Sequence, residues 1–505
     1  MNVLVLGDVG GPFHLGDDAM LEAAMAALPH HRWTVLSKDA ASTRARYGVR
    51  AVQQLGLSTD ARLDELVAAA RGEKPLSPDD PALDVLDAVA ATDAVLIAGG
   101  GNLASGWTQQ VYERAALAAL AMARSKPLVV TGQGLGPHLT KRDGELVASV
   151  LTSAQLVGVR SRDSALLARQ LGVPAHRVWT NDDDAMHLPG EGPDRGHVAV
   201  TLSPHHGLLH DTAEAWAGLL DHLVELTGLD VLLVPHTPDD VEHHDLCLTH
   251  VKSRRVRQVE ASLATSRQAA LVVSNRLHAV VAGLAGGVPA VGIATDAYTE
   301  AKLTGSLELQ GLASWCVSVH GLDNGLLQEA VDEAWARRTE ITEHLLPRIA
   351  HAEAASTRWW RTVDNALHGR PAAPQQPDVD LTEVVAAGAW SERNADALHW
   401  SRLLGARDLA WQQEREDLQL VATTATEELR HERQQRRAAH DETTELLETL
   451  AVERAAGDVA RAHNAELLDR DRALVSELEA MRATKVWRWT RGLRRAYGAS
   501  RRTDA

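Results

Sequence analysis

Short runs of aliphatic and β-branched residues recur along the first 370 positions, and longer stretches with helical spacing of apolar residues separate them. The runs have the length of strands that are buried on both faces. We predict strands at 3–6, 34–36, 94–97, 128–131, 156–159, 197–202, 231–234, 271–273 and 288–293. Amphipathic helices are expected between them, for example at 18–28 and 115–124. This alternation predicts an α/β fold of parallel sheets with helices on both faces.

Segments rich in proline, glycine and charge divide this α/β region from its surroundings. We expect a first Rossmann-like domain over 1–188 and a second over 197–368, because the stretch LPGEGPDRG between them has the composition of a connection. A second stretch, GRPAAPQQPDVD, begins at residue 369 and predicts a semi-extended linker over 369–390.

The region 391–482 changes character: it lacks proline and is dense in Glu, Arg, Ala and Leu. Apolar residues occupy many a and d positions of a heptad, namely Leu404, Trp411, Leu418, Leu429, Leu446, Leu450, Leu467, Leu474, Leu478 and Met481. Charged residues such as Arg415, Glu432 and Asp471 interrupt the same positions. Two interpretations stay open: a coiled coil that makes a homo-oligomer, which we favour, and a solvated helical hairpin packed on the body.

The C-terminal segment 483–505 is basic and carries Trp487 and Trp489 among its arginines. Tryptophan beside arginine suits the headgroup layer of an anionic membrane. We therefore expect peripheral contact with the inner face of the plasma membrane, the alternative being a basic tail that pairs with the acidic body.

Composition narrows the class of protein. A formal net charge of −17 argues against a generic nucleic-acid binder, which needs a basic face. Cys247 and Cys316 are the only cysteines, which argues against a disulfide framework or a thiolate zinc site. The uncharged stretch 277–295 contains a histidine, glycines and a proline, which favours helix–turn–strand over a membrane span. We expect a cytoplasmic protein without a signal peptide.

Four loops follow predicted strands in the first domain: GDVGGPFHLGDDAML (7–21), GGGNL (99–103), GQGLGP (132–137) and VRSRDS (159–164). Parallel strands end at one edge of a sheet, where glycine lets the backbone approach a ligand. None of the loops matches a dinucleotide or P-loop pattern. The substrate-binding residues expected from these loops are Gly16, Asp17, Asp18, Gly100, Gly101, Asn102 and Gly134.

Acids and paired histidines invite a metal hypothesis. We expect Asp17 and Asp18 to cap the helix that follows them, and one acid of NDDD (181–184) to cap or to point into the cleft. The histidine pairs at 30–31, 205–206 and 243–244 show no repeated carboxylate–histidine spacing, and adjacent side chains usually diverge. We predict surface histidines and no metal site.

Basic residues at strand ends are the remaining candidates for chemistry. Arg160 follows a strand of the first domain, and Arg276 and His278 open the stretch RLHAVVAGLAGGVPAVGI of the second. Two arginines and a histidine across a cleft suit a small polyanion with carboxylate and phosphate groups, and histidine can also move a proton. The alternatives are an interdomain salt bridge for Arg276 and a helix cap for His278.

The order of the motifs GDDAML, GGGNL, GQGLGP, VRxxxS, NDDDA, VLLVPHTPDD and SNRLHAVVAGLAGGVPAVGI resembles the polysaccharide pyruvyl transferases over about residues 1–345. The resemblance implies two Rossmann-like domains in a GT-B-like arrangement with ligands bound between them. It also implies transfer of the enolpyruvyl group of phosphoenolpyruvate to a sugar of a cell-surface polysaccharide or its precursor, which forms a pyruvate ketal and releases phosphate.

The same resemblance implies that Arg276 and His278 contact phosphoenolpyruvate, with Arg160 opposite them. His236 and Lys302 are expected in the same site. His278 is expected either to bind phosphate or to act as acid–base group. No cofactor and no metal are expected.

The chain departs from the family's pattern at two positions: His14 stands where Asn is frequent, and Ser161 where Asp is frequent. Two rival functions remain. One is a nucleotide-sugar glycosyltransferase of the same architecture, and the other is a non-catalytic scaffold that acts through its coiled coil.

Overall fold

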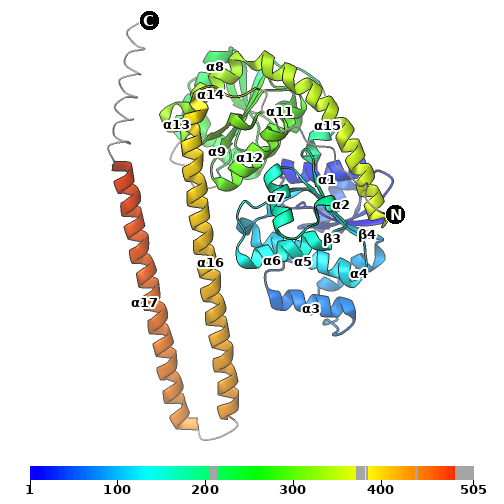
Figure 1. The fold of residues 1–505 in the computed structure, drawn as a ribbon, viewed down its shortest axis with the longest axis vertical. Helices are drawn as coiled ribbons and strands as arrows, with labels where there is room; N and C mark the ends of the chain where they lie inside the picture. The colour runs from blue at the N-terminus through cyan, green and yellow to red at the C-terminus, as the bar shows by residue number, and fades with distance from the viewer. Residues whose placement is uncertain (191, 205–212, 371–381, 383–384, 438–441, 484–505) are drawn as a thin grey trace. The chain divides into compact units, whose positions relative to one another are not determined.

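The aliphatic runs form two parallel sheets, both within the compact unit Met1–Gln413 (Figure 1). The computed structural model describes residues 1–505 except 191, 205–212, 371–381, 383–384, 438–441 and 484–505. A second compact unit comprises Glu414–Ala505.

The first sheet has the strand order β3-β2-β1-β4-β6-β7-β8, with β5 paired to β6. Its strands are β1 (Asn2–Leu6), β2 (Arg32–Ser37), β3 (Arg50–Gln53), β4 (Ala94–Ile97), β5 (Gly100–Leu103), β6 (Leu128–Leu135), β7 (Leu156–Val159) and β8 (Val178–Thr180). In the parallel register, Leu4 of β1 lies opposite Thr34 of β2 and Val95 of β4. The strand order reverses between β1 and β4, which makes a topological switch point.

The second sheet has the order β11-β10-β9-β12-β13-β14. Its strands are β9 (His197–Thr201), β10 (Asp230–Leu233), β11 (Val256–Gln258), β12 (Leu271–Ser274), β13 (Ala290–Ala294) and β14 (Cys316–Ser318). Here the order reverses between β9 and β12. Both sheets therefore present a switch point at the carboxyl ends of their strands, as expected for two Rossmann-like domains.

Five strands were not predicted: β3, β5, β8, β11 and β14. Each has only three or four residues, and several contain polar residues or glycine. The motifs GGGNL and GQGLGP, predicted as loops, lie largely within β5 and β6. Tertiary pairing overrides the weak local strand preference of these segments.

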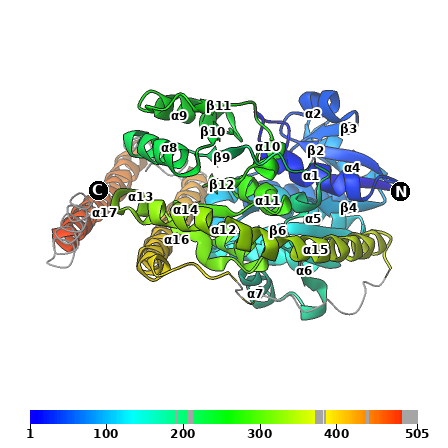
Figure 2. The ribbon, with the colours of Figure 1, turned by 90° about the horizontal axis from the view of Figure 1, so that it is seen from above.

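Helices cover the sheets on both faces (Figure 2). Those around the first sheet are α1 (Leu15–Ala27), α2 (Ala40–Tyr47), α3 (Asp60–Arg71), α4 (Ala82–Ala91), α5 (Thr108–Ala123), α6 (Lys141–Ser153) and α7 (Arg162–Gln170). Those around the second are α8 (Ala213–Thr227), α9 (Pro238–Leu248), α10 (Leu263–Gln268), α11 (Leu277–Ala285), α12 (Ala297–Leu309), α13 (Gly321–Asn324) and α14 (Leu326–Ala336).

Helix α1 begins earlier than predicted, at Leu15, and the side chain of His14 caps it by accepting a hydrogen bond from the N–H of Asp17. The prediction that Asp17 and Asp18 are the caps is therefore wrong. Both acids lie in the first turn, where their charge still complements the helix dipole.

Helix α15 (Arg338–Leu367) follows the second domain and packs back on the first (Figure 2). Trp359, Trp360 and Val363 are buried in a core cluster with residues of β1 and β4. Gly158 of β7 makes room for this helix, since a Cβ there would lie 2.3 Å from the Trp359 ring. The first domain is thus completed by a segment from beyond the second.

The first turns of α16 (Trp390–Arg437) complete the second domain in the same way. Trp390 and Leu398 are buried in its core, and Asn394 bonds the backbone of β14 through Ser318 N–H and the Cys316 carbonyl, each at 2.8 Å. Within the predicted linker, Val385 is buried and its carbonyl accepts a hydrogen bond from Trp315.

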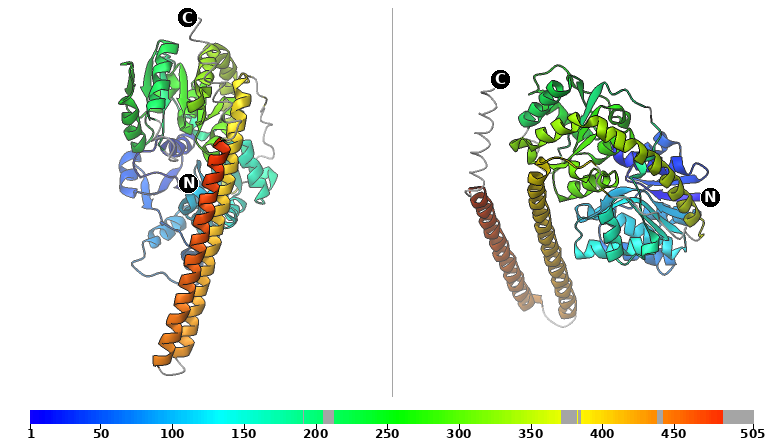
Figure 3. Two further views of the ribbon diagram at one scale, coloured as in Figure 1. Left: turned by 90° about the vertical axis from the view of Figure 1, so that its left-hand side faces the viewer. Right: turned by 45° about the horizontal axis from the view of Figure 1, so that its top comes forward.

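The unit Glu414–Ala505 contains the rest of α16 and α17 (Glu442–Ala483), both drawn as long helices in Figure 3. The prediction of an α-helical extension is confirmed, and its self-association as a coiled coil stays a prediction. In the part of the chain that the structure describes, no helix has the length and apolar run needed to span a membrane. The basic segment predicted to contact a membrane lies, apart from its first residue, outside that part.

Candidate functional site

A cavity of about 350 Å³ lies where the two switch points face each other. The first domain contributes charged and polar side chains to its wall: Asp8, His14, Asp17, Lys38, Asn102 and Arg160. The second domain contributes His236, Thr237, Arg276, His278, Tyr298 and Lys302. The structure therefore brings Arg160, Arg276, His278, His236 and Lys302, which were predicted separately, into one site.

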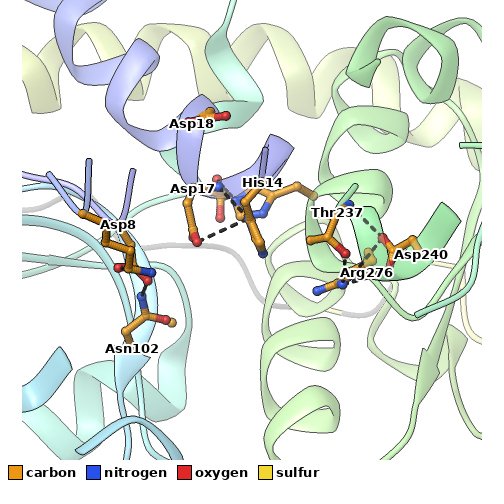
Figure 4. A network of polar contacts seen from close by, with 12 residues as sticks. Asp8, His14, Asp17, Asp18, Asn102, Thr237, Asp240 and Arg276 are labelled. Carbon is orange, nitrogen blue, oxygen red and sulfur yellow. Dashed lines mark hydrogen bonds and ion pairs between the residues drawn. The ribbon is translucent and has the colours of Figure 1, made fainter. Parts of the chain in front are cut away.

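Arg276 follows β12 and is held by residues of α9 (Figure 4). Its NH2 lies 2.8 Å from Asp240 Oδ1 and donates to Thr237 Oγ1 at 2.8 Å, and its Nε lies 3.2 Å from Asp240 Oδ2. Burial would raise the pKa of Asp240, but Arg276 outweighs burial and lowers it. Because Asp240 belongs to the same domain as Arg276, the alternative of an interdomain salt bridge is wrong.

Arg160 occupies the corresponding place after β7 and is 4% exposed. Its NH1 donates to Asp183 Oδ2 at 2.7 Å. A Cβ on Gly101 would lie 3.2 Å from Arg160 NH2, and one on Gly134 would lie 3.3 Å from Nε. These glycines allow the guanidinium to lie against the backbone of β5 and β6.

Asp183 connects the two domains at the cavity. Besides Arg160, it approaches His278, whose Nε2 lies 3.6 Å from Oδ1. Its Oδ1 also accepts the N–H of Ala185 at 3.0 Å, so Asp183 acts as a cap, one of the two roles predicted for an acid of NDDD. Burial would raise the pKa of Asp183, yet His278 and Arg160 lower it, and the carboxylate stays ionised.

His278 lies in the first turn of α11, where no side-chain capping bond forms, so the helix-cap alternative is wrong. The ring lies against α1: a Cβ on Gly16 would be 2.0 Å from His278 Nδ1. Beside it, the N–H of Leu15 donates to the carbonyl of His236 at 3.0 Å. Glycine at position 16 thus lets α1 of the first domain approach the ring of His278 in the second domain.

Lys302 of α12 lines the same cavity as the two arginines. Its Nζ is 4.1 Å from the centroid of the Tyr298 ring, and the Tyr298 hydroxyl donates to the Gly101 carbonyl at 2.9 Å. Burial, followed by Arg160 and Arg276, lowers the pKa of Lys302 to about 7. A lysine with such a pKa can take or release a proton near neutral pH.

Several wall residues were missed by sequence reasoning, Asp8 and Lys38 among them. Asp8 accepts a hydrogen bond from Asn102 at 2.6 Å and pairs with Lys38 at 2.7 Å (Figure 4). Asp8 follows β1 and Lys38 follows β2. Their positions after neighbouring parallel strands were the available signal. Tyr298 was also missed, and it carried no comparable signal.

Asp17 and Asp18 differ in direction (Figure 4). Asp17 lines the cavity, and its Oδ2 lies 3.2 Å from His14 Nδ1. Burial would raise the pKa of Asp17, but His14 and His278 outweigh burial and lower it. Asp18 instead pairs with Arg46 at 2.6 Å and accepts from Tyr47 at 3.2 Å, away from the cavity wall.

The remaining predicted glycines support the site without lining it: Gly16 underlies His278, Gly134 underlies Arg160, and Gly100 lies near Arg114 and Asn102. Two of the paired-histidine predictions are wrong. His31, His243 and His244 are buried, and His244 Nε2 accepts the Leu202 N–H at 3.0 Å. The pair 205–206 lies outside the described residues.

Comparisons with known proteins agree with this architecture. The family model described as polysaccharide pyruvyl transferase matches residues 14–297. No curated protein matches the chain. The S. aureus MnaA–UDP structure has a TM-score of 0.50 at 12% identity, over 75% of this chain and 100% of that one. Anabaena HepE in complex with UDP and glucose has a TM-score of 0.47 at 16% identity, over 73% and 100%. The likeness to MnaA, at 12% identity, concerns the fold alone.

Proposed function

This chain belongs to the polysaccharide pyruvyl transferase family and is an enzyme, and from that premise we propose the reaction that it catalyses. It transfers the enolpyruvyl group of phosphoenolpyruvate to two hydroxyls of a sugar in a cell-surface glycan or its precursor. The products are a pyruvate ketal and inorganic phosphate.

One observation carries the proposal: one arginine from each of two domains, together with Lys302, converges on one small cavity. Arg160 comes from the first domain, and Arg276 and Lys302 come from the second. Phosphoenolpyruvate carries a carboxylate and a phosphate on a three-carbon unit. Guanidinium groups match both anions in geometry and charge.

Each arginine retains nitrogen atoms for this anion. Arg276 uses Nε and NH2 for Asp240 and Thr237, which leaves NH1 for a ligand. Arg160 uses NH1 for Asp183 and holds NH2 beside Gly101 on the cavity wall. The buried acids keep the guanidinium groups oriented before the substrate arrives, which is the preorganisation that electrostatic catalysis requires.

The reaction balances without a further reactant. The first sugar hydroxyl bonds to C2 of phosphoenolpyruvate, its proton is taken up by a base, and the C3 methylene gains a proton and becomes a methyl group. The bond from C2 to the phosphate oxygen then breaks, the second hydroxyl bonds to C2, and its proton leaves with the phosphate. Each step needs one proton donor or acceptor at the C2–C3 unit.

His278 and Lys302 both line the cavity, and each can carry a proton. We assign His278 to the donor role at C3, since Asp183 on one side and Gly16 on the other hold its ring. Lys302, with its pKa of about 7, is assigned to accept the proton of the attacking hydroxyl. The choice between phosphate binding and proton transfer at His278 is decided by the pH profile of a His278→Gln variant.

The direct test measures phosphate release from phosphoenolpyruvate with a panel of glycosides, and the gain of a ketal in the product by mass spectrometry. Arg276→Gln should lower kcat/KM about 100-fold or more, because a buried charge partner of the anion is lost. Arg257→Gln is the matched control, since the Arg257 side chain on β11 is 55% exposed and pairs with Asp230 on β10. Phosphate release that is absent with every acceptor would reject the proposal.

The alternatives predict other outcomes of the same assays. A nucleotide-sugar glycosyltransferase would be stabilised by a nucleoside diphosphate sugar and not by phosphoenolpyruvate. A scaffold would lose its role on deletion of 391–505 while Arg276→Gln left it intact. Cytoplasmic location remains a prediction. Light scattering would test self-association through 391–482, and sedimentation with anionic vesicles would test membrane contact through 483–505.

A further inference from the structure

His30 and His31 lie in the connection between α1 and β2, and the structure places them against the last turns of α15. Asp364 Oδ1 lies 3.1 Å from His30 Nε2 and 2.9 Å from His31 Nε2. His368 Nδ1 lies 3.6 Å from the same oxygen. Three imidazoles therefore converge on one carboxylate oxygen from segments more than 300 residues apart.

Hydrogen bonding within the protein does not satisfy this cluster. His30 bonds Asp364 Oδ1, and His368 Nδ1 donates to the Asp364 carbonyl at 2.8 Å. The side chain of His31 is 0% exposed: its Nε2 pairs with Asp364 Oδ1 at 2.9 Å, and its Nδ1 has no hydrogen-bond partner. A buried polar group without a partner is costly, so the cluster calls for another ligand.

We propose that His30, His31 and Asp364 bind a divalent transition-metal ion of the zinc type. Their ligand atoms all lie within 4.8 Å of one another. Bonds of about 2.0–2.1 Å in a tetrahedral zinc site place neighbouring ligand atoms about 3.3 Å apart. The separations of 2.9 and 3.1 Å between the histidine nitrogens and Asp364 Oδ1 need only small side-chain shifts to reach that spacing.

Two imidazoles and one carboxylate leave one position of a tetrahedron for water. His30 and Asp364 line a surface cavity of about 700 Å³, and the His30 side chain is 57% exposed. An ion can therefore enter from this side, while His31 binds it from the protein interior. His30 lies at the surface, as predicted, and His31 is buried. The proposed site uses one ligand from each environment.

The ion would fasten α15 to the first domain. Asp364 lies next to Val363, which belongs to the buried core of that domain, and the rings of His31 and Trp33 pack in a T-shaped arrangement with centroids 5.9 Å apart. None of the three ligands lines the interdomain cavity. The site therefore acts on stability and is independent of the proposed reaction.

Sequence reasoning missed this site because it expected adjacent histidines to diverge. The His30 and His31 ring centroids are instead 4.3 Å apart, with planes tilted by 55°. The third ligand, Asp364, lies on α15, which follows the strands of the second domain. No spacing of residues within the predicted first domain, 1–188, could therefore reveal the site.

The test uses the full chain without a histidine tag, freed of metal by a chelator. Titration with Zn²⁺ in a calorimeter should show one equivalent bound, and Zn²⁺ at 100 times its Kd should raise Tm by on the order of 3 °C. Co²⁺ should give the strong visible absorption of four-coordinate cobalt. Absence of Zn²⁺ binding, or only the weak bands of six-coordinate cobalt, would overturn the proposal.

His30→Asn and Asp364→Asn should each weaken Zn²⁺ binding at least tenfold, as expected for removal of a direct ligand. Both side chains are partly exposed, so these variants should fold. His222→Asn is the matched control because His222 pairs with Asp332 at 2.6 Å through one imidazole and one carboxylate. Equal Zn²⁺ affinity in all three variants and the unaltered protein would assign the ion to adventitious histidines and reject the site.

Discussion

The two halves of the cavity hold an arginine in the same way but connect it to the rest of the molecule differently. Arg160 is paired with buried Asp183, and Arg276 with buried Asp240. The bonds of Asp240 go to Arg276 and to backbone groups of its own domain. Asp183 also approaches His278 of the opposite domain. Asp240 orients Arg276 alone. Asp183 orients Arg160 and also couples the two halves of the site through His278.

The largest effect that separates the two acids is expected on activity. Asp183→Asn should lower kcat/KM about 1,000-fold, because it removes the charge facing both Arg160 and His278. Asp240→Asn should lower it about tenfold to 100-fold, mostly through KM, since only the anion-binding Arg276 is released. Steady-state kinetics of phosphate release measures both.

Asp182→Asn is the control from the same run of acids. Asp182 bonds Gln310, and burial together with neighbouring Asp183 raises its pKa to about 6. Asp182 does not line the cavity, and asparagine keeps the shape of its side chain, so activity should stay within about twofold. Equal losses in Asp182→Asn and Asp183→Asn would contradict the coupling role.

The next effect concerns the contact of α1 with His278. Gly16→Ala should lower kcat about 10- to 100-fold, because the new Cβ would lie 2.0 Å from His278 Nδ1 and must displace the ring. Gly218→Ala in α8 has open space around its Cβ and should change neither activity nor fold. A crystal structure of Gly16→Ala with His278 in place would show that the contact is not needed.

A smaller effect is expected on stability as a function of pH. The folded pKa of Lys302 is about 7, below its ordinary 10.5, owing first to burial and then to Arg160 and Arg276. Between these values the unfolded chain binds one more proton, so stability rises with pH by at most ~1.4 kcal/mol per unit. Lys302→Met should flatten this part of the profile.

Urea unfolding of both proteins at several pH values from 7 to 10 measures the difference. Other groups titrate equally in the two proteins, so their contribution cancels. Parallel profiles would mean that Lys302 stays protonated in the folded protein over this range.

The smallest effect is expected for Asp18, which lies beside Asp17 but outside the cavity. Asp18→Asn weakens the contacts to Arg46 and Tyr47 and should lower the free energy of unfolding by about 1 kcal/mol. Activity should change by less than about twofold. Asp17→Asn, on the cavity wall, should instead raise KM or lower kcat measurably.

The sequence predicted the strands that carry continuous aliphatic runs, such as β1, β4 and β7, because burial on both faces determines their composition. It missed β5 and β8, which depend on pairing with a neighbour more than on their own residues. Edge and glycine-containing strands carry little local signal.

The candidate site was predictable where chemistry and position coincide. Arg160, Arg276 and His278 follow strands at the ligand edge, and the structure brings them to one cavity. Their acidic partners were harder to predict from the sequence, because Asp183 and Asp240 are 23 and 36 residues away from their arginines along the chain. The burial of His31 was missed for a related reason, since α15, which covers it, belongs to a distant segment.

The return of α15 to the first domain has a consequence for synthesis on the ribosome. The core around β1 and β4 lacks Trp359, Trp360 and Leu367 until nearly 370 residues have been translated. The second domain likewise awaits Trp390 and Leu398. A nascent chain therefore carries an incomplete first domain through the whole translation of the second, and ribosome-bound chains ending near residue 340 should remain open to proteases that the released protein resists.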